Sequence, residues 1–129
     1  MTDQAPDPLR GLRVLIVEDE YYLADDLTSE LRRRGAVVIG PVGTLDDARE
    51  QVEQTSFDCA ILDMNLRGDM AFPIADSLQD AGIPYVIATG YNSVSLPERF
   101  KGVPRVEKPF DPGQVASAIP MAISAASPK

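Results

Sequence analysis

The chain has 129 residues, of which 44% are hydrophobic, and this is enough apolar material for one domain with its own core. Its formal net charge of −8 argues against a nucleic-acid partner, because such binding relies on clustered lysine and arginine. The lack of histidine and the single cysteine, Cys59, argue against a zinc site and exclude an internal disulfide. No stretch resembles a signal peptide or a membrane span, so we expect a cytoplasmic protein without a membrane partner.

Strands and helices are predicted to alternate along the chain. Short runs rich in valine and isoleucine are typical of strands that are buried on both faces, and apolar residues at every third or fourth position are typical of amphipathic helices. In chain order we expect a disordered leader at residues 1–9, then a strand at 12–17, a helix at 20–34, a strand at 37–39, a helix at 44–55, a strand at 59–63, a helix at 72–81, strands at 83–88 and 104–107, and a helix after 111. This alternation predicts one α/β domain over residues 10–127, with a parallel sheet and helices on both of its faces.

Glycine and proline set several of these boundaries. The second strand is expected to end at Gly40-Pro41, and residues 65–69 are expected to form a polar loop around Gly68. Pro97 leaves room for only a turn or two of a fourth helix near residues 97–101. Pro120 lies inside the last helix, where proline costs about 3 kcal/mol, so we expect a kink or a restart there.

Four predicted strands end on side chains that are suited to phosphoryl transfer. These side chains are the acids Glu18-Asp19, the acid Asp63, the hydroxyl of Thr89 and the amine of Lys108. Each has an ordinary explanation when taken alone, since Asp19 or Asp63 could cap the next element and Thr89-Gly90 could form a turn. Because the carboxyl ends of parallel strands meet at one edge of a sheet, we expect all of them to converge on one site.

Carboxylates gathered in this way repel one another unless something neutralises them. Oxygen ligands without nitrogen or sulfur favour Mg²⁺, with Mn²⁺ as an alternative. In phosphoryl transfer the protein mainly positions the group and neutralises its oxygens, and a metal, a hydroxyl and a lysine perform this task together. Asp63 is then the expected nucleophile.

The chain resembles the receiver domain of two-component response regulators from Val14 to the last helix. The resemblance is carried by four motifs in register, which are Val17-Glu18-Asp19, Leu62-Asp63-Met64-Asn65, Ala88-Thr89-Gly90 and Lys108-Pro109-Phe110. It implies a flavodoxin-like, doubly wound five-stranded sheet in the order 2-1-3-4-5 with a short or irregular fourth helix.

The resemblance also implies a role for each motif residue. Asp63 would accept a phosphoryl group from a histidine kinase, and Asp19, Asp63 and the Asn65 carbonyl would bind Mg²⁺, with Glu18 assisting through water. Thr89 and Lys108 would hold the phosphoryl oxygens. The expected activity is limited to Mg²⁺-dependent self-phosphorylation and dephosphorylation at Asp63, so the chain is not expected to be an enzyme with an external substrate.

One position departs from the usual receiver pattern. Most receivers carry an aromatic residue three positions before the lysine, and this chain has Arg105 there. The run from Ile87 to Tyr91, followed by Leu96-Pro97, resembles the FATGUY subgroup, which lacks that aromatic residue and is linked to kinases of the HWE type. Readout of the phosphorylated state is therefore expected to use residues 91–103.

Two other functions share part of this pattern. A small haloacid-dehalogenase-like phosphatase also uses an aspartate nucleophile with Mg²⁺, but it needs an acid two residues later, where this chain has Asn65. An interaction module that is never phosphorylated is favoured only if the acids fail to bind metal. Only one helix is predicted after Lys108, so we expect a single-domain receiver without an output domain, which signals by binding a downstream protein or carries phosphate between proteins.

Overall fold

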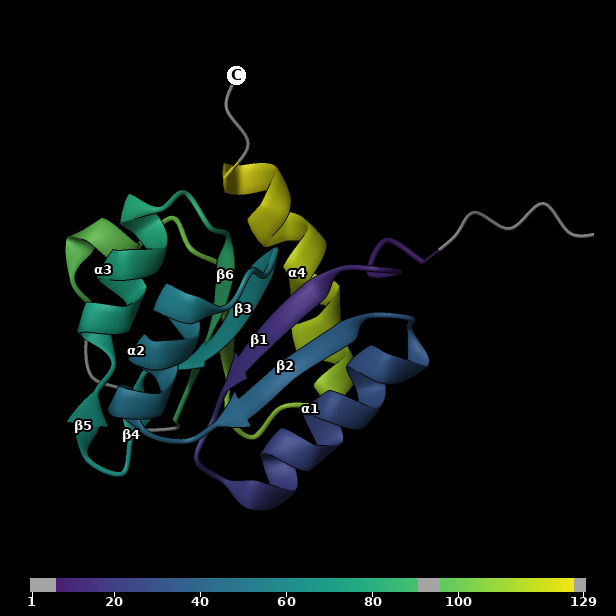
Figure 1. Ribbon diagram of the computed structural model, residues 1–129, viewed down its shortest axis with the longest axis horizontal. Coiled ribbons are helices and arrows are strands. Elements are labelled where there is room, and N and C mark those ends of the chain that lie inside the picture. The colour runs from purple at the N-terminus through teal and green to yellow at the C-terminus, as the bar shows by residue number, and fades with distance from the viewer. Residues whose placement is uncertain (1–6, 91–95, 127–129) are drawn as a thin grey trace, which may run out of the picture.

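Five parallel strands form the central sheet, in the order β2-β1-β3-β6-β7 (Figure 1). The computed structural model describes residues 7–90 and 96–126. The strands of the sheet are β1 (Arg13–Val17), β2 (Val37–Val42), β3 (Cys59–Asp63), β6 (Tyr85–Thr89) and β7 (Arg105–Glu107). Since β4 and β5 form a separate hairpin, this is the predicted order 2-1-3-4-5 counted over the main sheet, and the predicted doubly wound fold is confirmed.

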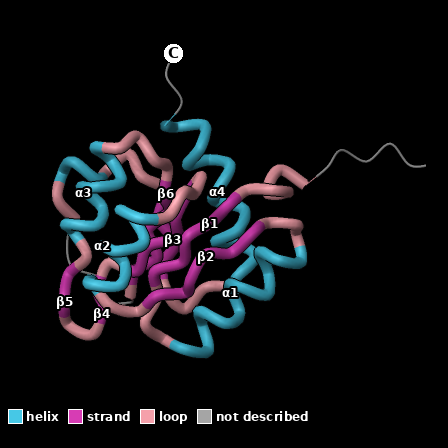
Figure 2. The backbone as a smooth tube through the Cα atoms, in the orientation of Figure 1, coloured by secondary structure: helices cyan, strands magenta, loops and turns pink. Residues whose placement is uncertain are grey.

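Helices cover both faces of the sheet, which lies between them in Figure 2. Helices α1 (Tyr21–Arg33) and α4 (Pro112–Ala126) pack on one face, and α2 (Leu45–Gln54) and α3 (Phe72–Asp80) pack on the other. Apolar residues lie on one side of each helix, so burying that side against the sheet removes it from water.

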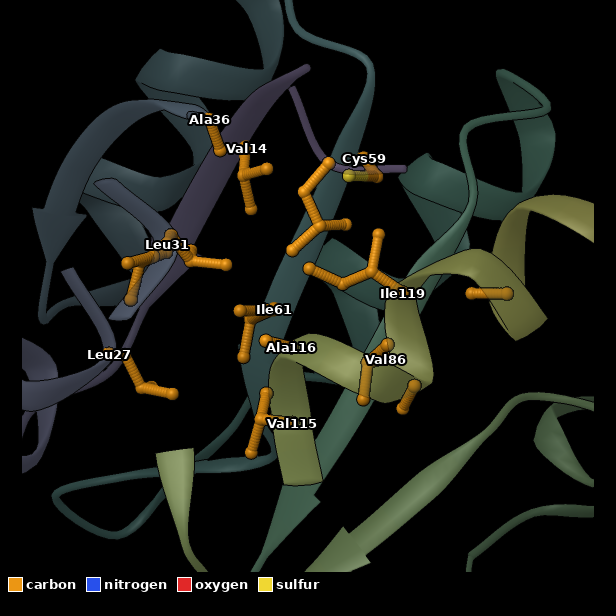
Figure 3. Close-up of a cluster of buried hydrophobic side chains, with 14 of the residues drawn as sticks. Val14, Leu27, Leu31, Ala36, Cys59, Ile61, Val86, Val115, Ala116 and Ile119 are labelled. Atoms are coloured by element: carbon orange, nitrogen blue, oxygen red, sulfur yellow. The ribbon is translucent and has the colours of Figure 1, made fainter. Parts of the chain in front are cut away.

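Alternate strand residues enter two separate cores. In β1, for example, Val14 and Ile16 join the core under α1 and α4, whereas Leu15 and Val17 join the core under α2 and α3. The first core, in which side chains from α1, α4 and the strands converge, is drawn in Figure 3. The two cores hold the strands rigidly, and this rigidity positions the side chains at the strand ends.

Strand β2 runs to Val42, although the sequence predicted its end at Gly40-Pro41. Its register with β1 shifts between Leu15 and Val17, so β2 holds an extra residue there. Gly40 has a φ of 88°, and a Cβ atom on it would lie 2.9 Å from the Val42 nitrogen. A bulge of this kind tolerates proline, so strand pairing resumes beyond it.

The predicted polar loop at residues 65–69 is a small hairpin, formed by β4 (Asn65–Leu66) and β5 (Asp69–Met70). Its two turn residues, Arg67 and Gly68, have φ values of 54° and 92°. Two-residue hairpin turns need such positive angles, for which Asn-Gly or Asp-Gly is the usual sequence signal. An Arg-Gly pair gives no such signal, so the hairpin was not predicted.

The region after β6 contains the short fourth helix that was expected. It is a single 3₁₀ turn, η1 (Glu98–Phe100), while the FATGUY residue Tyr91 and part of the proposed readout segment lie outside the described residues. Helix α4 continues through Pro120 as one element, so the predicted restart does not occur.

Leu9 was predicted to belong to a disordered leader, but it is fully buried in the core under α1 and α4. Its backbone nitrogen donates a hydrogen bond to the Asp7 carboxylate at 2.9 Å. The core therefore begins at Leu9, inside the segment that was predicted to be a disordered leader.

Replacing Leu9 with alanine should lower the free energy of unfolding by about 2–5 kcal/mol, the usual cost of deleting a fully buried leucine side chain. Denaturant unfolding measures this change, and exposed Arg10 provides the matched control, Arg10→Ala. Equal stabilities of the two variants would contradict the burial of Leu9.

Candidate functional site

Lys108 joins three carboxylates at the carboxyl edge of the sheet. Its Nζ atom lies 3.0 Å from Asp63 Oδ2 and 3.1 Å from both Glu18 Oε2 and Glu20 Oε2. The Lys108 backbone nitrogen donates to the Thr89 carbonyl at 2.7 Å, which attaches the lysine to the end of β6. The predicted convergence of Glu18, Asp63 and Lys108 is therefore present in the structure.

Burial and like charges shape the ionisation of this group. Burial raises the pKa of Glu18 to about 8, and the nearby Asp63 carboxylate adds to the increase. Burial also raises the pKa of Asp63 above its usual value, against the opposing effects of the Asn65 backbone N–H and Lys108. For Lys108 burial alone would lower the pKa, but the Glu18 and Asp63 carboxylates outweigh it and raise the pKa.

Asp19 completes a cluster of three acids. One carboxylate oxygen from each of Glu18, Asp19 and Asp63 lies within 4.8 Å of the others. Helix α1 has no side-chain N-cap, and Asp19 Oδ2 instead accepts a hydrogen bond at 3.0 Å from the backbone nitrogen of Arg67. The capping role considered for Asp19 is thus not observed.

The cluster has the donor chemistry that a hard divalent cation requires. Its ligand atoms are all oxygens, and buried Glu18 Oε1 has no hydrogen-bond partner among residues 7–90 and 96–126. An unpaired buried carboxylate oxygen is costly unless a cation or water satisfies it. The residues present therefore fit Mg²⁺ or Mn²⁺.

Asn65 lies beside the acids through its backbone. Its N–H donates to Asp63 Oδ1 at 3.0 Å, while its side-chain oxygen accepts from the Gly68 nitrogen at 2.7 Å inside the hairpin turn. Its side-chain oxygen thus stabilises the turn, and its main chain orients Asp63.

Thr89 ends the strand next to Asp63, since Asp63 pairs with Ala88 across the sheet. Its side chain is buried, and in the part of the chain that the structure describes its Oγ1 has no hydrogen-bond partner. A buried hydroxyl without a partner is unusual, and a polar group bound at the end of the strand would satisfy it.

Two residues near these acids were missed by sequence reasoning. Glu20 contacts Lys108, and its only signal was its place directly after Glu18-Asp19. Arg67 lines the same hollow as Asp63 and Lys108, and an arginine in a predicted loop gives no signal for such a role.

Arg105, at the usual aromatic position, is exposed on β7 with its guanidinium 3.8 Å from the Glu107 carboxylate.

The fold and the site together define a flavodoxin-like α/β domain with an acidic, lysine-containing centre at the carboxyl edge of its sheet. The family model for the response regulator receiver domain matches residues 14–120. The chain belongs to this family, and the haloacid-dehalogenase alternative loses its support.

Relatives of known name agree with this assignment. The sensory transduction protein LytT of Bacillus cereus is 33% identical over 113 residues, which cover 84% of this chain and 46% of LytT. The transcriptional regulatory protein PdtaR of Mycobacterium tuberculosis is 30% identical over 116 residues, which cover 87% of this chain and 57% of PdtaR. The chain thus spans about half the length of these curated relatives.

Solved structures show the same fold. The solution structure of SdrG from Sphingomonas melonis Fr1 is 38% identical, with a TM-score of 0.76 over 90% of this chain and 96% of that one. The BeF3-activated conformation of SdrG from Pseudomonas melonis Fr1 is also 38% identical, with a TM-score of 0.72 over 88% of this chain and 98% of that one. Within the described residues, every helix is too short or too polar to cross a membrane.

Proposed function

We propose that this receiver domain takes a phosphoryl group from a histidine kinase onto Asp63. The observation that carries the proposal is the 3.0 Å contact between Lys108 Nζ and Asp63 Oδ2. Thr89 ends the neighbouring strand, and its buried hydroxyl has no hydrogen-bond partner among the described residues. An Asp63 oxygen would form the new O–P bond while the P–N bond of phosphohistidine breaks and its electron pair stays on the imidazole. Lys108 and Thr89 would then hold the transferred oxygens.

Glu18, Asp19, Asp63 and the carbonyl of Asn65 are the residues that we assign to Mg²⁺, with Mn²⁺ as an alternative. A cation held there would neutralise the carboxylates and one phosphoryl oxygen. Release of the group would follow by attack of water on phosphorus, which returns the Asp63 carboxylate and inorganic phosphate. Beyond this cycle of self-phosphorylation and dephosphorylation we propose no enzymatic activity.

The finer assignments rest on sequence resemblance. We propose a kinase of the HWE type because Ala88-Thr89-Gly90-Tyr91 resembles the FATGUY motif and Arg105 replaces the usual aromatic residue. The phosphorylated chain would signal by binding a downstream protein or would pass its phosphate to another protein.

Intact-mass measurement after incubation with Mg²⁺ and acetyl phosphate tests the proposal. We expect a mass increase of one phosphoryl group that disappears when EDTA removes the metal. Absence of the increase at saturating donor would reject the proposed function.

We further expect residues 96–103 to change their backbone protection on phosphorylation. The segment is held to α3 by an Arg99–Asp76 ion pair at 2.7 Å and by stacking of Phe100 on Phe72, whose centroids are 5.9 Å apart. The ion pair is exposed and contributes little, whereas Phe100 is fully buried in the core under α2 and α3. We therefore expect the backbone around this anchored ring to have two arrangements of similar free energy.

Amide hydrogen exchange with and without BeF3, a phosphoryl mimic, measures this change. SdrG has a BeF3-activated conformation, which makes the mimic a suitable probe. If exchange changed elsewhere but not in residues 96–103, readout of phosphorylation through this segment would be contradicted, and a rigid phosphate carrier would be favoured.

A further inference from the structure

We propose that the guanidinium of Arg67 receives the anionic phosphodonor at the mouth of the Asp63 site and positions its phosphoryl group for transfer. This inference rests on the proposed function and adds a positioning residue to it. Nothing in the motifs that define the site includes Arg67, which lies in the turn of the β4–β5 hairpin.

Arg67 is fixed at the edge of the site by its main chain. Its N–H donates to Asp19 Oδ2 at 3.0 Å, and the next residue, Gly68, is bonded to the Asn65 side chain. In Figure 1 the hairpin lies at the end of the sheet where the arrowheads of the strands lie. The base of the Arg67 side chain is therefore anchored beside two residues that we assign to the metal.

The backbone conformation of Arg67 is one that glycine would adopt more easily than arginine. Its φ of 54° lies in the left-handed region, which glycine adopts without a steric penalty. Strained positions of this kind concentrate at functional sites. Having an arginine rather than a glycine at this position therefore carries a conformational cost.

The charges around Asp63 indicate a function for the Arg67 side chain. The hollow has a volume of about 340 Å³, and its described lining contains the acids Asp19, Glu20 and Asp63 with the cations Lys108 and Arg67. Lys108 is already in contact with Glu18, Glu20 and Asp63. The lysine charge is therefore shared among carboxylates, and even with a cation at the acids Lys108 offers only part of its charge to an incoming phosphoryl group.

The Arg67 side chain is exposed, and no described residue forms a hydrogen bond or ion pair with its guanidinium. Guanidinium groups bind phosphate oxygens in a bidentate manner, and a cation beside a cleft raises the rate at which anions enter it. Among the described residues that line the mouth, Arg67 is thus the cation without a carboxylate partner, and it can bind an anionic donor.

The test compares Arg67→Gln with Arg67→Lys, because both variants keep the backbone N–H that bonds Asp19 and both keep the left-handed strain. With subsaturating acetyl phosphate and Mg²⁺, the second-order labelling rate of Arg67→Gln should fall about threefold to tenfold, and Arg67→Lys should recover most of it. The rate of the parent chain should also fall more steeply with added NaCl than that of Arg67→Gln. Arg10→Gln, before β1 at the amino end of the sheet, is the control for loss of a surface charge.

Mg²⁺ affinity separates this role from a structural one. Removing a positive charge beside the acids should leave Mg²⁺ binding equal or slightly tighter in Arg67→Gln, although labelling slows. A parallel loss of Mg²⁺ affinity and labelling would show that Arg67 only holds Asp19, and an unchanged labelling rate or failure of lysine to rescue would equally overturn the inference. If the parent chain takes no phosphoryl group, the proposed function fails and the inference fails with it.

Discussion

Replacing Asp63 with asparagine is expected to abolish labelling by acetyl phosphate while the fold is retained. The amide has nearly the same shape as the carboxylate but lacks the anionic oxygen that attacks phosphorus. Lys108 keeps Glu18 and Glu20 as partners in the variant. Intact mass should therefore show the added phosphoryl group in the parent chain and none in Asp63→Asn.

Stability measurements on the same variant provide an independent check. Burial raises the pKa of Asp63 above 3.8, so the folded chain binds this proton more tightly than the unfolded chain, and stability declines as pH rises through the range above 3.8. Asp63→Asn has no carboxylate at this position, so the loss of stability with rising pH that is due to Asp63 should be absent in the variant. In the absence of Mg²⁺, the midpoint of thermal unfolding at pH 7 should be equal or higher in Asp63→Asn.

Asp80→Asn is a matched control, because Asp80 is exposed at the end of α3. It should be labelled like the parent chain. Undiminished labelling of Asp63→Asn would place the acceptor elsewhere, and a lower thermal midpoint at pH 7 would contradict the pKa of Asp63 that burial raises.

Mg²⁺ is expected to stabilise the parent chain and to have almost no effect on Asp19→Ala. Ligand binding to the folded state adds about 1.4 kcal/mol when Mg²⁺ is at ten times its Kd, and this corresponds to an increase of about 5 °C in Tm for a domain of this size. Asp19 contributes one of the three clustered carboxylates, so its removal takes away both a ligand and part of the charge that attracts the cation.

Thermal unfolding with Mg²⁺ and after EDTA measures this difference, and Asp80→Ala should respond to Mg²⁺ like the parent chain. If the parent Tm did not change with Mg²⁺, the metal assignment would be wrong. In that case an interaction module without phosphorylation would become the better function.

Local patterns in the sequence were sufficient for the architecture. Buried strands such as Cys59–Asp63 are read from continuous apolar runs, and helix α1 is read from its periodicity and from Gly35 after it. The order of strands and helices then restricts the topology, because parallel crossovers have one hand. The same logic located Asp63 and Lys108, since residues that directly follow parallel strands meet at one edge.

Tertiary structure decided what those rules leave open. Leu9 lies in a polar, proline-containing segment, and only packing against the core shows that it is buried. The partners of Lys108 depend on where β7 ends relative to β1 and β3, which are distant in sequence.

Arg67 shows the same limit most clearly. Its turn angles and its bond to Asp19 arise from contact between segments 48 residues apart, which no local pattern encodes. The sequence by itself thus determined the strands, the helices and the acids at the strand ends, because periodicity and turn chemistry act over a few residues. Only the tertiary structure decided which charges meet, because that depends on register and long-range packing.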